Sequence, residues 1–418
     1  MRCSVFLVFG CLAFVAAGTA SAQDGNVSPL TLRAALEEAV HANPELIALR
    51  REYDATAAVI PQARSLGAPM METQIWGWPV TTLNPIRTDM YMFMAEQELP
   101  GRGKRAAREL VASREAQMSK QQVAVRTNEI LNDVKKAYAE LALARGSASL
   151  YERQTPVLQN MADAATLRYA SGHSGQHDTV KSIVELARLH TDAVEWQERA
   201  RMAETRLNVL RGRAPDAPVP LLEESEITVP AAADAERIAL ERHPEVAMAS
   251  AIVAREEAEL TRLRGERRPD FVVGGGYMLQ PGAAGAWTAK AGISWPNAPW
   301  SRSGITTAVA AQEKKVEAAR ARQDVVATTV RRDVREATVR LDAARLRVQL
   351  LESTVIPHVE HAFDVARAAY ALNRGEFADL LDTERLVLST EMDHIAARTD
   401  IVRAIADFET AVGDVLEN

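Results

Sequence analysis

The spacing of apolar residues divides the chain into long helical stretches and short strand-like ones. Leu30–Ser65 repeats its apolar positions at helical spacing and predicts a helix. Met70–Pro79 and Met90–Leu99 are two short apolar runs joined by a loop, which predicts a β-hairpin with strands of about ten residues. Strands of that length can cross a bilayer at a tilt, and they also suit a soluble hairpin. Gly103–Ala170 is then nearly unbroken helix, on the order of 100 Å long at a rise of about 1.5 Å per residue.

The same order of elements returns in the second half of the chain, offset by about 200 residues. It comprises a helix at Ala235–Gly265, apolar runs at Pro269–Gln280 and Ala286–Pro296, and a long helix at Ser303–Leu372. Five motifs keep this register: NPE at 43–45 with HPE at 243–245, Pro100 with Pro299, DVK at 133–135 with DVR at 333–335, Tyr169 with Tyr370, and Gly212 with Gly413. An offset that stays near 200 residues throughout indicates one duplication rather than a solenoid.

The second long helix carries a heptad repeat, which predicts supercoiled packing against neighbouring helices. The heptad positions are Val334, Leu341, Val348 and Val355, with Ala337, Ala344 and Leu351 between them.

Each long helix is expected to turn back and form a helical hairpin. Gln176–Gly212 returns first, and the Pro-rich stretch 213–234 links it to Ala235–Gly265. Together these two pieces match the long helix in length, so we expect them to stack end to end, and the Leu30 helix and the last helix to form the equivalent pair. The resulting division is a first repeat at 23–212 (β-hairpin about 70–99, helical hairpin about 103–212), a linker at 213–234, and a second repeat at 235–418 (β-hairpin about 269–296, helical hairpin about 303–413).

A single copy of this arrangement leaves surfaces without partners. Two hairpins give four strands with two open edges, and the helices keep an apolar stripe that one chain does not cover. We therefore expect the protein to associate with copies of itself.

Residues 1–22 have the pattern of a secretory signal peptide. Arg2 precedes the apolar run Val5–Ala17, and Ala20-Ser21-Ala22 forms a small-residue cleavage site. Both cysteines, Cys3 and Cys11, lie in this segment, so we expect no disulfide and no cysteine ligand in the mature chain. A lipid anchor on Cys11 is the alternative use of this segment.

Composition narrows the class of protein. A net charge of −7 argues against nucleic-acid binding, and the Ala-rich hydrophobic fraction of 47% with only 5% aromatic residues favours long, closely packed helices. Beyond the signal segment, the sequence has no run of 18 apolar residues and no HExxH, GxSxG, Walker or dinucleotide-binding pattern. We therefore expect neither an enzyme nor a cofactor.

Several motifs resemble those of TolC-type outer-membrane efflux proteins across nearly the whole mature chain: NPEL and HPEV, LPGRGKR, RYASGHSGQHDTVKSIVELA, AETRLNVLRGR and AAYALNRGEFADLLDTERL. The resemblance implies a mainly α fold with a membrane β part. In it, a homotrimer closes a twelve-stranded β-barrel in the outer membrane, a twelve-helix tunnel continues this barrel through the periplasm, and the linker lies in an equatorial belt.

The same resemblance implies a passive exit duct for metal cations or drugs. An inner-membrane pump of the resistance-nodulation-division type would supply it through a periplasmic membrane-fusion adaptor. LPGRGKR is similar to the heavy-metal cation efflux branch of the family. A periplasmic coiled-coil adaptor or scaffold without a barrel is the alternative function.

The turns of the helical hairpins are expected at the end far from the membrane. Gly172 follows Tyr169 by three residues, and Asn373 follows Tyr370 by the same spacing. Both Gly and Asn tolerate the left-handed conformation that ends a helix.

Acidic residues beyond these turns are candidates for a channel gate. Asp379 and Asp382 resemble the acidic constriction of the family; they lie on one helix face, and three copies would bring six carboxylates to the pore mouth. Asp178 is the equivalent in the first repeat, where it either takes part in the gate latch or caps a helix. The family often has a basic residue where Gly375 stands, and Arg374 lies one position earlier, so we expect the latch to be either rewired through Arg374 or weaker.

Two groups could bind metal. His173 and His177 are four residues apart and could bind a soft divalent ion, although solvated loop residues explain them as well. Met90, Met92 and Met94 could form a copper relay, and a lipid-facing or core-facing strand is the simpler interpretation.

The junction between barrel and tunnel is predicted at PGRGKR. Pro100 would end the hydrogen bonding of the strand, the glycines would allow a bend, and the basic residues would mark a water-facing rim. The junction residues are Pro100, Gly101, Arg102 and Lys104 in the first repeat, and Pro299 and Arg302 in the second.

Overall fold

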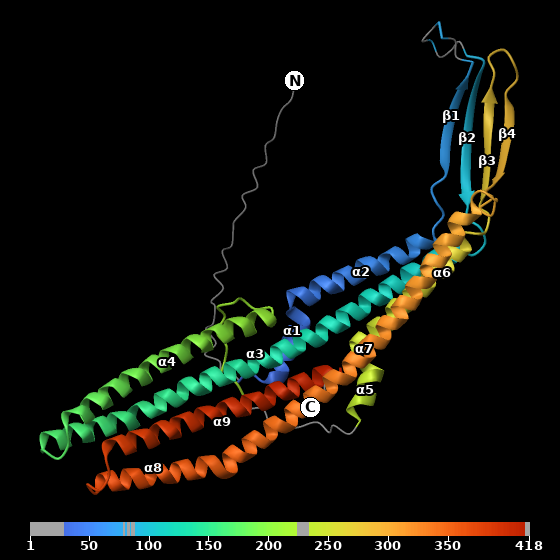
Figure 1. Ribbon diagram of the computed structural model, residues 1–418. Helices are drawn as coiled ribbons and strands as arrows, with labels where there is room; N and C mark the ends of the chain where they lie inside the picture. Colours follow the sequence, from blue (N-terminus) through green and yellow to red (C-terminus); the bar gives the residue numbers. More distant parts are fainter. Residues whose placement is uncertain (1–28, 78–79, 82–83, 85–87, 224–233, 414–418) are drawn as a thin grey trace, which may run out of the picture.

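The computed structural model describes residues 29–77, 80–81, 84, 88–223 and 234–413. The predicted signal peptide and most of the second half of the linker lie outside these residues. A long body of helices carries a four-stranded sheet at one end (Figure 1). None of the helices in the described ranges is long and apolar enough to cross a membrane.

The two repeats have the same order of elements. The first contains α1 (Leu32–Ala42), α2 (Pro44–Arg64), β1 (Met70–Trp76), β2 (Met90–Leu99), α3 (Lys104–Ala170) and α4 (Gln176–Leu210). The second contains α5 (Ala235–Arg242), α6 (Pro244–Gly265), β3 (Phe271–Leu279), β4 (Ala286–Ile293), α7 (Arg302–Leu350), a π-helical turn (Leu351–Val355), α8 (Ile356–Ala371) and α9 (Phe377–Val412). The predicted β-hairpins and helical hairpins are therefore present in both halves.

The single helix predicted at Leu30–Ser65 is wrong, because two helices meet at Asn43. Pro44 has no N–H group, and its ring disfavours a helical conformation at the preceding residue. Asn43 ends α1, and its side-chain oxygen accepts hydrogen bonds from the N–H groups of Glu45 and Leu46 at the start of α2. His243 makes the same break between α5 and α6, so the helix predicted at Ala235–Gly265 is also divided.

The predicted stacking of the returning helices is wrong as well. The end of α4 meets the start of α2, since Asn43 donates a hydrogen bond to the Leu210 carbonyl and a Cβ atom on Gly212 would lie 2.1 Å from the Ala42 carbonyl oxygen. In the same way the end of α9 meets α6, because a Cβ on Gly413 would lie 2.7 Å from the Cα of His243. Each repeat therefore closes on itself, with α4 followed by α2 along α3 (Figure 1).

The second long helix is interrupted by the π-helical turn, where the prediction had one helix to Leu372. In the helices before this turn corresponding residues differ by 200 positions, as Asp133 and Asp333 do, and after it by 201, as Tyr169 and Tyr370 do. The turn thus accommodates one inserted residue, which is the usual origin of a π-bulge. Val334, Leu341 and Val348 of the predicted heptad are buried, whereas Val355 inside the turn is exposed.

The core consists of seams between helices. One seam surrounds Val134, Tyr138 and Leu141 of α3 near the middle of the body, and another surrounds Leu158, Leu189 and Leu381 close to the turns. The first seam includes the buried alanines Ala35, Ala39, Ala137 and Ala203, which let helices approach closely and agree with the composition.

The sheet has the order β1-β2-β3-β4 with every pair antiparallel. The β2–β3 pair joins the two repeats, and β1 and β4 form the outer edges. Side chains of residues that pair across an antiparallel sheet lie on the same face, so the register defines two faces.

The two faces differ in chemistry. One is apolar and aromatic, with Tyr277 and Trp287 in edge-to-face contact at 5.1 Å; its members are Met71, Ile75, Tyr91, Phe93, Leu99, Phe271, Val273, Tyr277, Leu279, Trp287 and Ile293. The other carries the charged groups Glu72, Glu96, Glu98 and Lys290 and the amide Gln74, together with Trp76, Met70, Met90, Met92, Met94 and Met278, whereas the amide Gln97 lies on the first face. Along β3 the residues of the apolar face are mostly exposed, and those of the second face are partly buried.

Candidate functional site

The tip turns have the predicted backbone conformation. Gly172 has φ of 75° and Asn373 has φ of 59°, both in the left-handed region, and each follows the last turn of a long helix. The Gly or Asn requirement at these positions is therefore a matter of backbone geometry.

The predicted gate carboxylates are exposed near this tip. Asp379 lies in the first turn of α9, and Asp382 lies one turn further, where its carboxylate is 3.2 Å from Arg385. Arg385 also forms an ion pair with Glu185 of α4, so the helix that carries both aspartates is tied to its neighbour. Both carboxylates face water in one copy of the chain and are available to other copies; their role as a gate stays a prediction.

A pocket lies between the two tip turns. Asp178 is buried there, with an oxygen 3.0 Å from His177 Nε2. The guanidinium of Arg168 lies 4.0 Å from the centre of the Tyr370 ring, which joins the two hairpins through a cation–π contact. Tyr169 is exposed, in contrast to the buried Tyr370, so the two tip tyrosines are not equivalent.

The predicted latch residues Arg374 and Gly375 lie in the second turn. Arg374 is exposed, and its backbone N–H donates to the Ala369 carbonyl. Gly375 packs closely against the helix end, since a Cβ there would lie 3.2 Å from Ala369 Cβ. The latch through Arg374 stays a prediction.

The two candidate metal ligands have other neighbours. His173 Nδ1 lies 3.1 Å from Ser171 Oγ, and His177 contacts Asp178. Within the residues that the structure describes, no group of three or more His, Cys, Asp or Glu side chains could hold a metal ion.

Glu384 is a buried carboxyl that the sequence did not reveal. It lies on α9 and is 4% exposed, and its Oε1 atom has no hydrogen-bond partner among the described residues. Burial raises the pKa of the Glu384 carboxyl to about 7, and the charge of nearby Glu185 contributes to the rise. The corresponding position in the first repeat is Ile183, so only the second repeat has this group.

At the first junction the prediction for Lys104 is wrong, because its side chain is 3% exposed and does not form a water-facing rim. Its ammonium group lies 2.7 Å from Asp270 and 3.1 Å from Glu266, which together compensate the buried charge. Asp270 also accepts a hydrogen bond from the backbone N–H of Gly101, so one carboxylate holds both ends of the bend. Arg102 is exposed, as predicted.

The other junction residues lie at the boundaries between strand and helix. β2 ends at Leu99, immediately before Pro100, and Gly103 has φ of 86° at the start of α3. In the second repeat Pro299 and Arg302 are exposed, and Arg302 begins α7. The buried Lys104 pair has no counterpart there, because Gly304 occupies the equivalent position.

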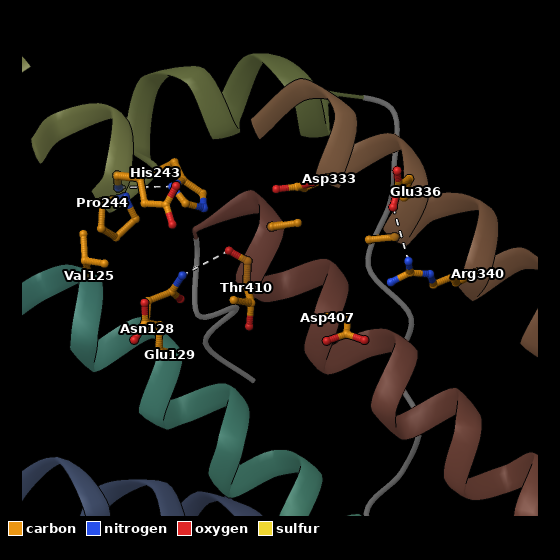
Figure 2. A pocket seen from close by; sticks show the side chains of 13 residues that line it. Val125, Asn128, Glu129, His243, Pro244, Asp333, Glu336, Arg340, Asp407 and Thr410 are labelled. Atoms are coloured by element: carbon orange, nitrogen blue, oxygen red, sulfur yellow. Dashed lines mark hydrogen bonds and ion pairs between the residues drawn. The ribbon is translucent and has the colours of Figure 1, made fainter. Parts of the chain in front are cut away.

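A second pocket lies at the middle of the body, where α3 meets α6, α7 and α9 (Figure 2). His243 is buried at its edge; its Nδ1 accepts the N–H of Glu245, and burial lowers the pKa of its imidazole. Asn128 of α3 donates to the Thr410 carbonyl of α9 across the pocket (Figure 2). The pocket therefore marks a contact between the first repeat and the second.

The long paired helical hairpins and the four-stranded sheet define a class of fold that can be compared with known proteins. Residues 237–414 match the family model described as outer membrane efflux protein. The cobalt-zinc-cadmium resistance protein CzcC of Cupriavidus metallidurans is 25% identical over 401 residues, covering 92% of this chain and 90% of that protein. The second half of the chain is therefore similar to outer membrane efflux proteins, and nearly the whole chain is similar to CzcC.

Solved structures share the fold over the same extent. The crystal structure of CusC has a TM-score of 0.79 at 14% identity and covers 92% of each chain. The open state of the Neisseria gonorrhoeae MtrE outer membrane channel has a TM-score of 0.75 at 16% identity, covering 92% of this chain and 89% of that one. The chain thus has the fold of outer-membrane efflux channels.

Proposed function

We propose that three copies of this chain form a ring that closes a twelve-stranded barrel and a twelve-helix tunnel, and that this duct conducts metal cations. The observation that carries the proposal is the packing of α9 of the second repeat on α3 of the first. Among the described residues of one chain, the corresponding surfaces of α4 and α7 have no such partner.

Inside the chain, α9 of the second repeat packs on α3 of the first. Lys135 pairs with Glu409, and the Lys136 ammonium lies 2.5 Å from Asp407. This contact joins one repeat to the next, so repetition of the same step should place α4 of one copy on α7 of another.

The surfaces required for that step are exposed and apolar. Val339 and Leu346 of α7 correspond to Ala139 and Gly146 of α3, and both are more than half exposed. On α4, Val194, Met202 and Val209 correspond to residues that α9 uses, and they are also more than half exposed. Burial of these side chains against a second copy would remove them from water.

The charges support the same step with reversed sign. Lys136 corresponds to Glu336, and Asp407 corresponds to Arg206. The ion pair between repeats inside the chain thus becomes an expected Glu336–Arg206 pair between copies. The open edges of β1 and β4 would meet in the same ring, with the apolar face of the sheet toward lipid.

Cross-linking tests this arrangement. The chain has only two cysteines, both in the predicted signal peptide, so Glu336→Cys with Arg206→Cys gives two defined thiols in the mature protein. A short bismaleimide should convert this variant to covalent trimers on a reducing gel. The matched control, Lys136→Cys with Asp407→Cys, should cross-link within one chain and stay at monomer size. A monomer in detergent by light scattering would contradict the trimer.

The gate, the partners and the cargo belong to the same proposal. Asp379 and Asp382 from three copies form an acidic ring at the tip, which favours cations and repels itself. A periplasmic membrane-fusion adaptor would engage the tip, and an inner-membrane pump of the resistance-nodulation-division type would supply the energy. The name of the Cupriavidus relative supports a metal cargo. A strain without this chain should then lose resistance to metal salts; sensitivity to antibiotics alone would favour drugs.

A further inference from the structure

Three methionines occupy neighbouring register positions on the charged face of the sheet, at the seam between the repeats. Met92 of β2 lies directly opposite Met278 of β3 in the register. Met94 is the next residue of β2 on that face, and it lies opposite Gly276. The three thioethers therefore occupy neighbouring positions on one pair of strands.

The glycine at 276 brings the sulfur of Met94 over β3. A Cβ atom at Gly276 would lie 2.5 Å from Met94 Sδ, so the sulfur occupies the space that a side chain would fill. Met278 is two residues away on the same face. Met94 is only 9% exposed, which makes it the most enclosed side chain of β2.

This placement argues against simple lipid packing. Side chains that contact lipid should share the aromatic face, yet Met92, Met94 and Met278 lie on the face with the charged groups. Glu72 is opposite Met94 on its other side and accepts a hydrogen bond from Gln74 at 2.8 Å. The methionines thus border a carboxylate in a polar setting.

We propose that Met92, Met94 and Met278 form a contact site for a soft monovalent cation of the Cu(I) or Ag(I) class. This inference rests on the proposed function, in which the charged face of the sheet lines the passage. Thioether sulfur is a soft ligand that favours such ions over the harder divalent ones, and the mature sequence has no thiol to compete.

The ligand chemistry suits passage rather than storage. Thioethers are neutral, so the bound ion keeps its positive charge, and the Glu72 carboxylate beside Met94 supplies the attraction. Conduction requires a site that attracts an ion and also releases it, which neutral ligands achieve better than thiolates. Three copies in a ring would repeat the site three times around the exit.

Silver titration of the purified full-length protein in detergent tests the site. Ag(I) as its nitrate, in chloride-free buffer, is added to the wild type and to the variant Met92→Leu/Met94→Leu/Met278→Leu in a calorimeter. Leu for Met conserves volume, so the sheet should fold, and circular dichroism checks this. The affinity for Ag(I) should fall by about tenfold or more in the variant.

A matched variant controls for loss of methionine in general. Met71→Leu/Met118→Leu/Met248→Leu removes the same number of thioethers from the apolar face of β1 and from helices, and it should bind silver as the wild type does. Equal affinities in all three proteins would overturn the site. Channel conductance of the wild type is recorded separately. Normal conductance, with equal silver affinity in the wild type and the Met92/Met94/Met278 variant, rejects this inference alone. Absence of both conductance and trimers in the wild type rejects the proposed function.

Discussion

Replacement of Glu384 by glutamine should remove a loss of local stability that occurs near the tip turns as the pH rises. Glu384 is buried on α9, and the pKa of its carboxyl is raised to about 7 by burial and by the charge of Glu185. Arg385 lowers this pKa and Glu391 raises it, with smaller effects. The glutamine side chain would resemble the protonated acid in shape and would not ionise.

The size of the effect follows from the difference between folded and unfolded states. The unfolded value is 4.5 and the folded one about 7, so the folded protein binds this proton more tightly. The stability gained from the protonated form is complete below pH 4.5 and is lost as the pH rises through about 7. At about 1.4 kcal/mol per pH unit, the loss is about 3 kcal/mol, or roughly 300-fold in a local opening equilibrium.

Amide hydrogen exchange measures this opening directly. Peptides from the first turns of α9 are followed at pH 5 and pH 8, and the rates are corrected for the intrinsic effect of pH on exchange. Protection in the wild type should fall by up to about 70-fold between the two conditions relative to Glu384→Gln, because roughly a quarter of the full free-energy effect is already lost below pH 5. Glu198→Gln, an exposed position on α4, serves as the control and should behave as the wild type does.

If protection of the α9 peptides falls between pH 5 and pH 8 by the same factor in Glu384→Gln as in the wild type, the reasoning is refuted. That result would mean that other groups set the pH dependence of the tip and that the Glu384 carboxyl is ionised without cost.

Two other substitutions test the gate and the junction. Asp379→Ala with Asp382→Ala should raise single-channel conductance and abolish cation selectivity in planar bilayers, because the acidic ring is removed; unchanged currents would count against a gate there. Lys104→Met should destabilise the protein by about 3 kcal/mol, since the carboxylates of Glu266 and Asp270 lose their buried partner. Thermal unfolding followed by circular dichroism measures this loss, and a melting temperature equal to that of the wild type would show that the ion pair contributes nothing.

Local signals predicted the elements and much of the tip. Apolar periodicity located the strands and the long hairpins, since it reflects which side of each element is buried. Gly172 and Asn373 were recognisable because few residue types accept a positive φ. The Pro44 break was also readable in principle, because proline restricts its neighbour, yet the helical spacing on both sides concealed it.

Contacts between distant segments could not be predicted in this way. α4 and the segment 235–265 have lengths that suit end-to-end stacking, so the sequence favoured the wrong partner. Tertiary contacts such as the Asn43–Leu210 hydrogen bond and the close approach of Gly212 to Ala42 identify α2 as the continuation. Lys104 in a basic motif suggested a wet rim, because its partner Asp270 is far away in sequence. Glu384 differs from other helix carboxylates only in what surrounds it.

The sequence by itself determined the duplication, the order of elements and the positions of the turns, because these depend on spacing and on backbone preferences of single residues. The tertiary structure alone decided which returning helices meet, which charges are buried, and which face of the sheet carries the methionines. These properties depend on the register between strands and on the docking of helices, where a change of one residue moves a side chain to the opposite face.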